Sequence, residues 1–585
     1  MAVRNRDIAG MLNEIADLLE IRDANSFRVR SYRNAARTVG SLNEEVADLV
    51  ERGEDLSALP DIGESIAGKL EEIVATGRLE QLEELRKEMD ADVTELLRIP
   101  NLGPAGARTL YGELGITNAQ GIIAAAEEGT IAELSGFGEK TQSQLARDAR
   151  TFLERGARER MLLGEADDVV DPLLEYLRSR RSVRRAVAAG SYRRRRETIG
   201  DVDILVESDD PDDAMDALSN YDRVESVVSK GSTRSTVILA SGLHVDLRAV
   251  SSESYGAALY YFTGSKEHNV AVRRLAQERD LKVNEYGVFD GEEQIAGDTE
   301  ESVFQSVGLP WICPELRENR GELEAARDGA LPKLIELDDI RGDLHLHTTA
   351  SDGKNTIAEL ARAADRRGYE YLAVTDHSVR VRMANGLDED RLAEQIREVR
   401  RVNEETKEIE ILAGIEVDIL KDGSLDLPDD LLSELDVVVA AVHYDRDMGA
   451  SAMADRVVRA ITSHPVSIFA HPTGRLIGSR EPYEIDLDPV FEAAASSGVW
   501  LELNGNPERL DLSDLDARAA VERGVRLVIS TDAHSAGELS LMRYGVDTAR
   551  RGWVEAAHVM NTRPLDEFRA ELRGSAERGE GSNGG

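Results

Sequence analysis

Three aspartates in the first half of the chain have the spacing of a divalent-metal site. Asp201 and Asp203 are two positions apart in a stretch with strand character, so their carboxylates would point to the same face. Asp246 lies within the apolar run Leu243–Arg248, where a charge is unfavourable unless it binds a cation. Two cations held by three carboxylates would stabilise the attacking and leaving oxygens of a phosphoryl transfer. A lone Asp-x-Asp is more often the solvated end of a strand.

The turn that precedes these aspartates has the composition of a phosphate-binding loop. Gly190 and Ser191 would hold a triphosphate through backbone N–H groups and a hydroxyl, and Arg194 would act as a charge clamp. Because this turn and the Asp-x-Asp occur together, we favour a nucleotidyl-transfer site over a solvated strand end.

In the second half of the chain, metal-ligand residue types recur where apolar strands end. In a parallel βα barrel the C-terminal ends of the strands converge on one face, so these side chains would gather in one pocket. Imidazoles with a few carboxylates suit Zn²⁺ or Mn²⁺. A single histidine at a strand end is usually an ordinary core or surface residue, but here six strands repeat the pattern. The strand ends carry His345 with His347, His377, Glu416, His443, His471, and Asp532 with His534.

Apolar periodicity predicts the elements that position these residues. Ile8, Leu12 and Ile15 lie on one helical stripe, strands begin at about residue 165, and short apolar strands alternate with helical segments beyond the middle of the chain. The last pattern is typical of a parallel sheet or barrel. We expect helical regions at 1–85 and 86–160, a mixed region of strands and helices up to about 316, a polar linker at 317–340, a strand–helix region at 341–572 and a disordered tail at 573–585.

Three segments of the helical region share a tight turn that a helix follows at once. Such a turn leaves backbone N–H groups free at a helix N-terminus, where a DNA phosphate can bind without a side-chain charge. One such turn is as often an ordinary helix connection, but three in succession favour DNA contact. The segments resemble helix-hairpin-helix motifs, although Asp61 and Asn101 replace the first glycine in two of them. The glycines of the predicted hairpins are Gly63, Gly103, Gly136 and Gly138.

The composition is strongly acidic, with 112 acidic against 71 basic residues and a formal net charge of -41. Net charge alone argues against DNA, because affinity for nucleic acid rests largely on Lys and Arg neutralising phosphates. The acidic residues are spread along the chain, however, and this resembles proteins of halophilic archaea. In molar salt the Debye length falls to about 3 Å, so repulsion from DNA is screened. Because Cys313 is the single cysteine and no apolar run has the length of a signal peptide or membrane helix, we expect a soluble cytoplasmic protein.

The Gly-Ser turn followed by Asp-x-Asp resembles the nucleotidyltransferase signature of X-family DNA polymerases, whose best-known member is polymerase beta. The similarity covers about residues 1–316, and Asn284–Gly287 matches the end of the family's thumb. It implies an 8-kDa-like helical domain at 1–85, a helix-hairpin-helix fingers-like domain at 86–160, an α+β nucleotidyltransferase palm at 161–250 and a thumb at 251–316.

The same resemblance assigns roles to individual residues. It implies that Asp201, Asp203 and Asp246 are the catalytic metal ligands. The segment Tyr261–Ser265 matches the family's sugar-contacting segment, Asn269 its base-contacting asparagine and Arg273 its minor-groove arginine. The residues implied to bind the incoming dNTP are Gly190, Ser191, Arg194, Tyr261, Phe262, Gly264, Asn269 and Arg273.

Lys69 occupies the position of the Schiff-base lysine that gives some X-family members 5′-deoxyribose-phosphate lyase activity. A lysine amine beside a phosphate pocket could do this chemistry if its pKa were lowered. Arg28 and Ser65 stand where relatives have phosphate-binding lysines, and Arg234 replaces a lysine common in bacterial relatives. A lone lysine on a helix is usually solvated, so lyase activity stays an open alternative.

The region 341–572 resembles the PHP (polymerase and histidinol phosphatase) domain, a distorted (β/α)7 barrel with a trinuclear metal site. Asp352 falls in a loop where family members use His or Asp. In X-family chains this domain implies a Mn²⁺-dependent 3′→5′ exonuclease, with AP endonuclease or 3′-phosphatase action as further activities. The nine implied ligands are His345, His347, Asp352, His377, Glu416, His443, His471, Asp532 and His534.

Together the two resemblances imply a gap-filling DNA repair polymerase that also trims 3′ ends. Its cofactors would be Mg²⁺ or Mn²⁺ at the polymerase site and Mn²⁺ or Zn²⁺, up to three ions, at the PHP site. Its partners would be gapped or primer–template DNA and dNTPs, with no membrane, and we expect a monomer. Two alternatives stay open: a small-molecule phosphatase that its N-terminal half tethers to DNA, and a polymerase whose PHP domain is purely structural.

Overall fold

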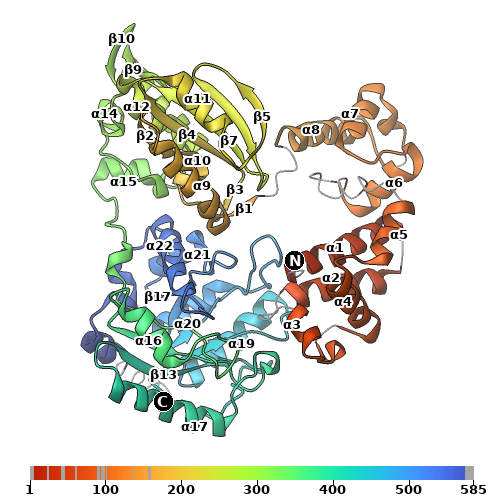
Figure 1. The fold of residues 1–585 in the computed structure, drawn as a ribbon, viewed down its shortest axis with the longest axis vertical. Helices are drawn as coiled ribbons and strands as arrows, with labels where there is room; N and C mark the ends of the chain where they lie inside the picture. The colour runs from red at the N-terminus through yellow and green to blue at the C-terminus, as the bar shows by residue number, and fades with distance from the viewer. Residues whose placement is uncertain are drawn as a thin grey trace. The chain divides into compact units, whose positions relative to one another are not determined.

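The chain forms two compact units, one of residues 1–159 with 478–481 and the other of residues 160–477 with 482–585. Figure 1 labels many of the helices and strands of both units. The predicted tail, 573–585, lies outside the described residues. The computed structural model describes residues 5–22, 25–40, 46–59, 62–88, 93, 96, 99, 102–134, 136–155 and 160–572.

The first unit is helical, as the periodicity predicts. Along α1 (Asn5–Ile21), the stripe of Ile8, Leu12 and Ile15 is fully buried, and α1 packs against α2 (Ser26–Gly40). A helix with one apolar face gains most of its stability by burying that face against a neighbour. The other elements are α3 (Val46–Glu51), η1 (Leu56–Ala58), α4 (Glu64–Thr76), α5 (Glu80–Glu88), α6 (Pro104–Leu114), α7 (Ala119–Glu128), η3 (Thr130–Glu133) and α8 (Glu139–Arg155).

The second unit begins with a five-stranded sheet in the order β2-β4-β7-β6-β5. Strands β4 and β7 run parallel, and the other neighbouring strands run antiparallel. Helices α9 and α11 pack on one face, where Leu177 and Leu218 share a core with Val206. The bounds are β1 (Met161–Leu162), α9 (Leu163–Arg178), β2 (Val183–Ala188), α10 (Gly190–Arg193), β3 (Thr198–Ile199), β4 (Asp201–Ser208), α11 (Pro211–Ser219), β5 (Val224–Lys230), β6 (Arg234–Leu239) and β7 (His244–Val250).

A second α+β region follows this sheet along the chain. It has its own hydrophobic core, in which Tyr260, Val272 and Phe304 are fully buried. Within the range predicted as a linker, Arg317 and Glu322 are also fully buried. The elements are η4 (Ser252–Ser254), α12 (Tyr255–Thr263), α13 (Lys266–Gln277), a three-stranded sheet of β8 (Leu281–Asn284), β9 (Gly287–Asp290) and β10 (Glu293–Ala296), then α14 (Glu300–Ser306), η5 (Pro314–Leu316), α15 (Glu322–Asp328) and η6 (Leu337–Asp339).

The rest of the second unit is a nearly closed barrel of seven parallel strands in sequence order, β11 to β17. A parallel bridge between Leu346 and Ala533 links the first and last strands at one end. The strands are β11 (Gly342–Asp343), β12 (Tyr371–Val374), β13 (Glu410–Asp418), β14 (Val437–Ala441), β15 (Ile468–Phe469), β16 (Trp500–Asn504) and β17 (Leu527–Ser530). This architecture confirms the predicted (β/α)7 barrel.

Helices surround the barrel, and buried residues such as Leu360, Val399 and Val457 join them to the strands in one core. Among the described residues, no helix is long and apolar enough to cross a membrane. The helical elements of the barrel are α16 (Ile357–Asp365), η7 (Arg382–Ala384), α17 (Glu389–Glu405), α18 (Asp429–Leu432), α19 (Ala450–Ser463), α20 (Leu487–Ser497), α21 (Asp514–Glu522), η8 (Glu538–Leu541), α22 (Met542–Arg551), η9 (Ala556–His558) and η10 (Met560–Thr562).

Candidate active sites

The three aspartates of the first half meet on two neighbouring strands. Asp203 of β4 lies directly opposite Asp246 of β7 in the parallel register, and Asp201 lies opposite His244. Because side chains alternate along a strand, Asp201, Asp203 and Asp246 share one face of the sheet. Burial and repulsion by the Asp201 and Asp246 carboxylates raise the pKa of Asp203 to about 6. Such a cluster of like charges is suited to divalent cations.

Two arginines and a threonine partly balance this cluster. Arg248 Nε lies 3.9 Å from an Asp203 carboxylate oxygen, and Arg234 Nη2 lies 3.3 Å from an Asp246 oxygen. The Thr236 hydroxyl donates a hydrogen bond to Asp246. Arg234, which replaces a common lysine, therefore lies beside the aspartates and keeps a positive charge there.

The Gly-Ser turn lies next to the aspartates, as the motif requires. Gly190 has a φ of +64°, and a Cβ at this position would lie 3.6 Å from an Asp203 carboxylate oxygen. Only glycine adopts this conformation without strain. The backbone N–H of Ala189 donates to the Asp203 carbonyl at 2.7 Å, so the turn that contains Gly190 and Ser191 is fixed to β4.

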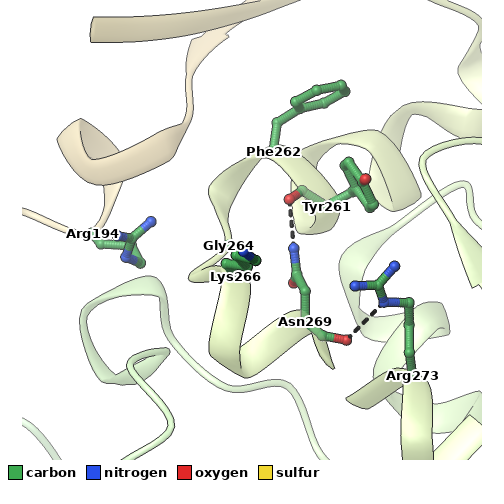
Figure 2. Close-up of a pocket in the computed structure, with 7 residues that line it drawn as sticks. All are labelled: Arg194, Tyr261, Phe262, Gly264, Lys266, Asn269 and Arg273. Atoms are coloured by element: carbon green, nitrogen blue, oxygen red, sulfur yellow. Dashed lines mark hydrogen bonds between the residues drawn. The ribbon is translucent and has the colours of Figure 1, made fainter. Parts of the chain in front are cut away.

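A cavity of about 270 Å³ lies close to this turn, between Arg194 and the helices α12 and α13 (Figure 2). Asn269 Nδ2 donates to the Tyr261 carbonyl at 2.7 Å, and Arg273 Nε donates to the Asn269 carbonyl at 3.3 Å. Of the residues predicted to bind dNTP, all except Gly190 and Ser191 line this cavity. The lining residues are Arg194, Tyr261, Phe262, Gly264, Lys266, Asn269 and Arg273.

Lys266 is the one lining residue of this cavity that the sequence did not predict. It is the first residue of α13, directly after the segment Tyr261–Ser265 that the sequence singled out. Because lysine is rare in this chain, a lysine directly after that segment could have been recognised as a candidate nucleotide-binding residue. The sequence did not predict Arg248 either. Its Cζ lies 4.4 Å from the centre of the Phe262 ring, so Arg248 connects the aspartate cluster to the wall of the cavity.

In the barrel, the predicted ligands converge at the C-terminal ends of the strands. Glu416 lies at the centre, with ring nitrogens of His377, His471 and His443 at 2.7, 3.0 and 3.3 Å from its carboxylate. Three groups have all ligand atoms within 4.8 Å of one another. They are His347, Asp352, His377 and His534; His345, His347 and Asp532; and His377, Glu416 and His443. All nine predicted side chains thus lie in one pocket, with His471 joined through Glu416.

The chemistry of this pocket fits metal ions. Buried atoms that face it, such as His345 Nε2, His347 Nδ1 and Asp352 Oδ2, have no hydrogen-bond partner. Buried polar atoms without partners are rare in proteins, and a cation would satisfy these. Burial and the positive charge of Arg509 lower the pKa of His471 to about 4, so this imidazole is neutral and its nitrogen lone pair is available to a metal.

A second layer of carboxylates orients the histidines. Glu502 accepts a hydrogen bond from His345 Nδ1 at 2.7 Å and another from the backbone N–H of His471 at 2.7 Å. Asp418 accepts from the backbone N–H of His443 at 3.0 Å, and His443 Nδ1 lies 3.3 Å from the same carboxylate. Such partners fix which ring nitrogen faces the metal. Sequence reasoning missed both carboxylates, although each interrupts or ends an apolar strand.

Two arginines place positive charge at the barrel pocket. Arg509 Nε lies 3.3 Å from an Asp532 carboxylate oxygen. Burial and the neighbouring positive charge of Arg509 lower the pKa of Arg446 to about 10, and Arg446 Nε has no hydrogen-bond partner. Two adjacent guanidinium groups favour an anionic ligand such as a phosphate. Neither arginine lies in a motif that the sequence singled out.

In the helical unit, the predicted hairpin glycines lie at helix starts. Gly63 and Gly103 are the N-terminal caps of α4 and α6, and neither cap has a side-chain hydrogen bond to the helix. Gly138 directly precedes α8, and Gly136 has a φ of +87°. The first turns of these helices therefore offer backbone N–H groups to an anion. Asp61 and Asn101 lie outside the described residues.

Lys69 lies half-buried on α4, and its Nζ lies 3.4 Å from the Ser65 carbonyl. Arg28 is exposed, on α2. Lyase activity at Lys69 therefore stays a prediction.

A nucleotidyl-transfer site on one sheet and a histidine-rich metal pocket in a barrel define a polymerase joined to a phosphoesterase. Comparisons with known families agree. Family models match for a helix-hairpin-helix domain (3–79), a helix-hairpin-helix tandem (93–151), a DNA polymerase beta palm (163–275), a DNA polymerase beta thumb (258–318) and a PHP domain (343–504).

Individual relatives match the whole chain or the barrel alone. The DNA polymerase/3′-5′ exonuclease PolX of Bacillus subtilis is 38% identical over 98% of this chain and 100% of its own length. A probable phosphatase of Thermoanaerobacter is 28% identical over 38% of this chain and 89% of its own length. Another, of Caldanaerobacter subterraneus, is 30% identical over 33% of this chain and 75% of its own length. The chain therefore belongs to the X family of DNA polymerases, in the group that carries a PHP domain, and depends on divalent metals.

Proposed function

We propose that the chain is a DNA-directed DNA polymerase that fills short gaps during DNA repair. The observation that supports this most directly is the pairing of Asp203 with Asp246 beside the cavity of about 270 Å³. Divalent ions, Mg²⁺ or Mn²⁺, held by the three aspartates would neutralise the charge that develops on the reacting phosphate.

The cavity would orient the incoming dNTP. Arg194, with Gly190 and Ser191 of the neighbouring turn, would bind the triphosphate. Tyr261, Phe262 and Gly264 would contact the sugar, and Asn269 and Arg273 would contact the base pair from the minor groove. In the reaction, the primer 3′-hydroxyl loses its proton and attacks the α-phosphate, and pyrophosphate leaves.

We further propose that the barrel is a 3′→5′ exonuclease, with AP endonuclease action as an additional activity. The nine side chains around Glu416 would hold Mn²⁺ or Zn²⁺, up to three ions, which supply an activated water for hydrolysis of a P–O bond. Arg509 and Arg446 would hold the scissile phosphate. The relatives named as probable phosphatases match the barrel alone, so small-molecule phosphatase activity is the second candidate for this pocket.

The partners follow from this function. Gapped or primer–template DNA would contact the helix starts at Gly63, Gly103 and Gly138, and the protein would act as a monomer in the cytoplasm. The domain limits at residues 85, 160, 250, 316, 340 and 572 belong to this proposal, with lyase activity at Lys69 as a further candidate activity.

Paired variants test the assignment of two separate sites. Asp203→Ala should abolish primer extension and leave 3′-end degradation intact, because the barrel does not use this carboxylate. His345→Ala with His347→Ala should abolish degradation and spare primer extension. Both activities are measured on one labelled gapped substrate with Mn²⁺ at high KCl, after circular dichroism has shown that each variant is folded. Loss of both activities in either folded variant would contradict the two-site assignment.

The same variants separate the alternatives. A small-molecule phosphatase would leave the labelled DNA intact and hydrolyse p-nitrophenyl phosphate. A purely structural barrel would show neither hydrolysis, and the histidine substitutions would then change stability alone.

A further inference from the structure

Hydrogen bonds join Arg194 of the nucleotide cavity to the barrel. Arg551 Nη1 donates to the Arg194 carbonyl at 2.7 Å and to Glu318 Oε1 at 3.1 Å. Arg194 Nε donates to the same Glu318 oxygen at 3.0 Å. Arg551 Nη2 donates to Asp514 at 2.8 Å. A residue of the PHP barrel therefore contacts both the backbone of Arg194 and the carboxylate that its side chain binds.

Arg551 is held firmly in this place. It is the last residue of α22, and Asp514 is the first residue of α21. A cation at a helix C-terminus and an anion at a helix N-terminus each interact favourably with the helix dipole. The Arg551 side chain is 5% exposed, so its ion pairs are shielded from solvent and its position is well defined.

The negative charge of Glu318 is unfavourable for triphosphate binding in the nucleotide cavity. Its carboxylate lies against Arg194, where it would repel a triphosphate and draw the Arg194 guanidinium away from the cavity. Arg551 and Arg196 also lie near this carboxylate, at 3.1 and 3.6 Å. Although burial alone would raise it, these three arginines lower the pKa of Glu318, so it stays ionised. The three arginines face two carboxylates, Glu318 and Asp514, so the cluster keeps a net positive charge for an anionic ligand.

We propose that Arg551 of the PHP barrel is a positioning residue for the polymerase reaction. It fixes the Arg194 carbonyl and takes up part of the Glu318 charge. The Arg194 guanidinium, which donates to Glu318 through Nε and to the Thr263 carbonyl through Nη1, is then less neutralised and can attract the triphosphate of the incoming nucleotide. This inference rests on the proposed role of Arg194. It means that part of the nucleotide affinity of the polymerase site is supplied by the barrel.

The test compares Arg551→Gln with Arg550→Gln. Arg550 is the preceding residue of α22 and pairs with Glu315 at 2.8 Å, so it joins the same two parts of the chain without contacting Arg194. Single-nucleotide gap filling gives KM for dNTP and kcat, and 3′-end degradation reports on the integrity of the barrel. Arg551→Gln should raise KM roughly fivefold to tenfold with kcat within about twofold, because one charged hydrogen-bond donor is lost. Arg550→Gln should leave KM unchanged, and neither variant should alter degradation.

The variant is expected to fold, because no carboxylate is left without a cation. Asp514 keeps Arg320 at 2.9 Å, and Glu318 keeps Arg194 and Arg196. Should Arg551→Gln nevertheless unfold, Arg551→Lys carries the test. Lysine keeps the charge but cannot reach all three acceptors, so KM should rise by about threefold. An unchanged KM in the folded variant, or an equal rise in Arg550→Gln, would overturn the inference.

A double-mutant cycle separates this inference from the proposed function. Arg194→Gln should raise KM for dNTP by itself, and adding Arg551→Gln should then cause little further rise, because Arg551 acts through Arg194. If Arg194→Gln leaves KM unchanged, the proposed role of Arg194 is wrong and the inference is refuted with it. If Arg194→Gln raises KM but the two effects multiply, Arg194 binds the nucleotide and the inference alone is refuted.

Discussion

Glu502→Gln should weaken metal binding in the barrel, although Glu502 is not among the nine predicted ligands. Glu502 is fully buried and accepts hydrogen bonds at its two oxygens, from His345 Nδ1 and from the backbone N–H of His471. A glutamine amide has one acceptor oxygen and one NH2 group. His345 Nδ1 carries the proton when Nε2 faces the metal, so both groups that face the Glu502 side chain are donors. In either orientation of the glutamine amide, its NH2 group would therefore face a donor.

The size of the effect follows from this geometry. One charge-assisted hydrogen bond is lost and replaced by a repulsive contact between two donors, which costs about 1.5–3 kcal/mol. Metal affinity or exonuclease rate should therefore fall roughly tenfold to hundredfold, the range found when such partners of metal-bound histidines are removed. Primer extension should be unchanged, because Glu502 does not contact the polymerase site.

The assay is a titration of 3′-end degradation with Mn²⁺, which gives the half-saturating concentration and the rate at saturation. Glu508→Gln is the matched control, because Glu508 is exposed and lies a few residues away on the same segment. If Glu502→Gln behaves like Glu508→Gln while degradation still requires Mn²⁺, then Glu502 does not orient the ligands and the argument is wrong.

Three further predictions concern charge. Arg193 and Arg317 lower the pKa of buried Glu300 to about 2 despite the opposing effect of burial, so Glu300→Gln should cost about 3 kcal/mol at neutral pH. Since a depressed carboxyl pKa stabilises the folded state above the unfolded value, that difference should shrink as pH falls from about 4.5 towards about 2, measured by urea unfolding. Arg509→Ala should slow 3′-end degradation about tenfold to hundredfold and spare primer extension, whereas Arg523→Ala, an exposed arginine of the same barrel, should not. With a net charge of -41, the urea midpoint should rise between about 0.2 and about 2 M KCl as self-repulsion is screened, and a flat midpoint would count against a halophilic origin.

Most ligands of the barrel were predictable because they lie at or just beyond the ends of strands, while Asp352, in a loop, came from the family resemblance alone. His377, Glu416 and His443 are far apart in the sequence, but the parallel topology brings all strand ends to one face. The aspartates were predictable for a related reason, since Asp201 and Asp203 alternate along one strand and Asp246 interrupts another. In each case a local pattern was sufficient once the fold class was known.

The residues that were missed act through contacts that no local pattern reveals. Glu502 and Asp418 lie in buried strands, where a carboxylate is equally consistent with an ordinary ion pair. The contact between Arg551 and Arg194 joins residues 357 positions apart. The residues that replace the first glycine of two hairpins, Asp61 and Asn101, lie outside the described residues, so the DNA-binding role of those turns stays a prediction.

Other ion pairs also cross between the polymerase part and the barrel, including Arg195 with Asp547 at 2.7 Å and Arg475 with Glu197 at 2.9 Å. In each pair one partner precedes residue 340 and the other follows it. A substitution on one side would therefore favour a compensating substitution on the other, and exchange of either half between distant lineages would break several pairs at once. Natural selection should then keep the two halves together. Phylogenetic trees calculated separately from the polymerase part and from the barrel should therefore have the same branching order, even though each fold could perform its own chemistry.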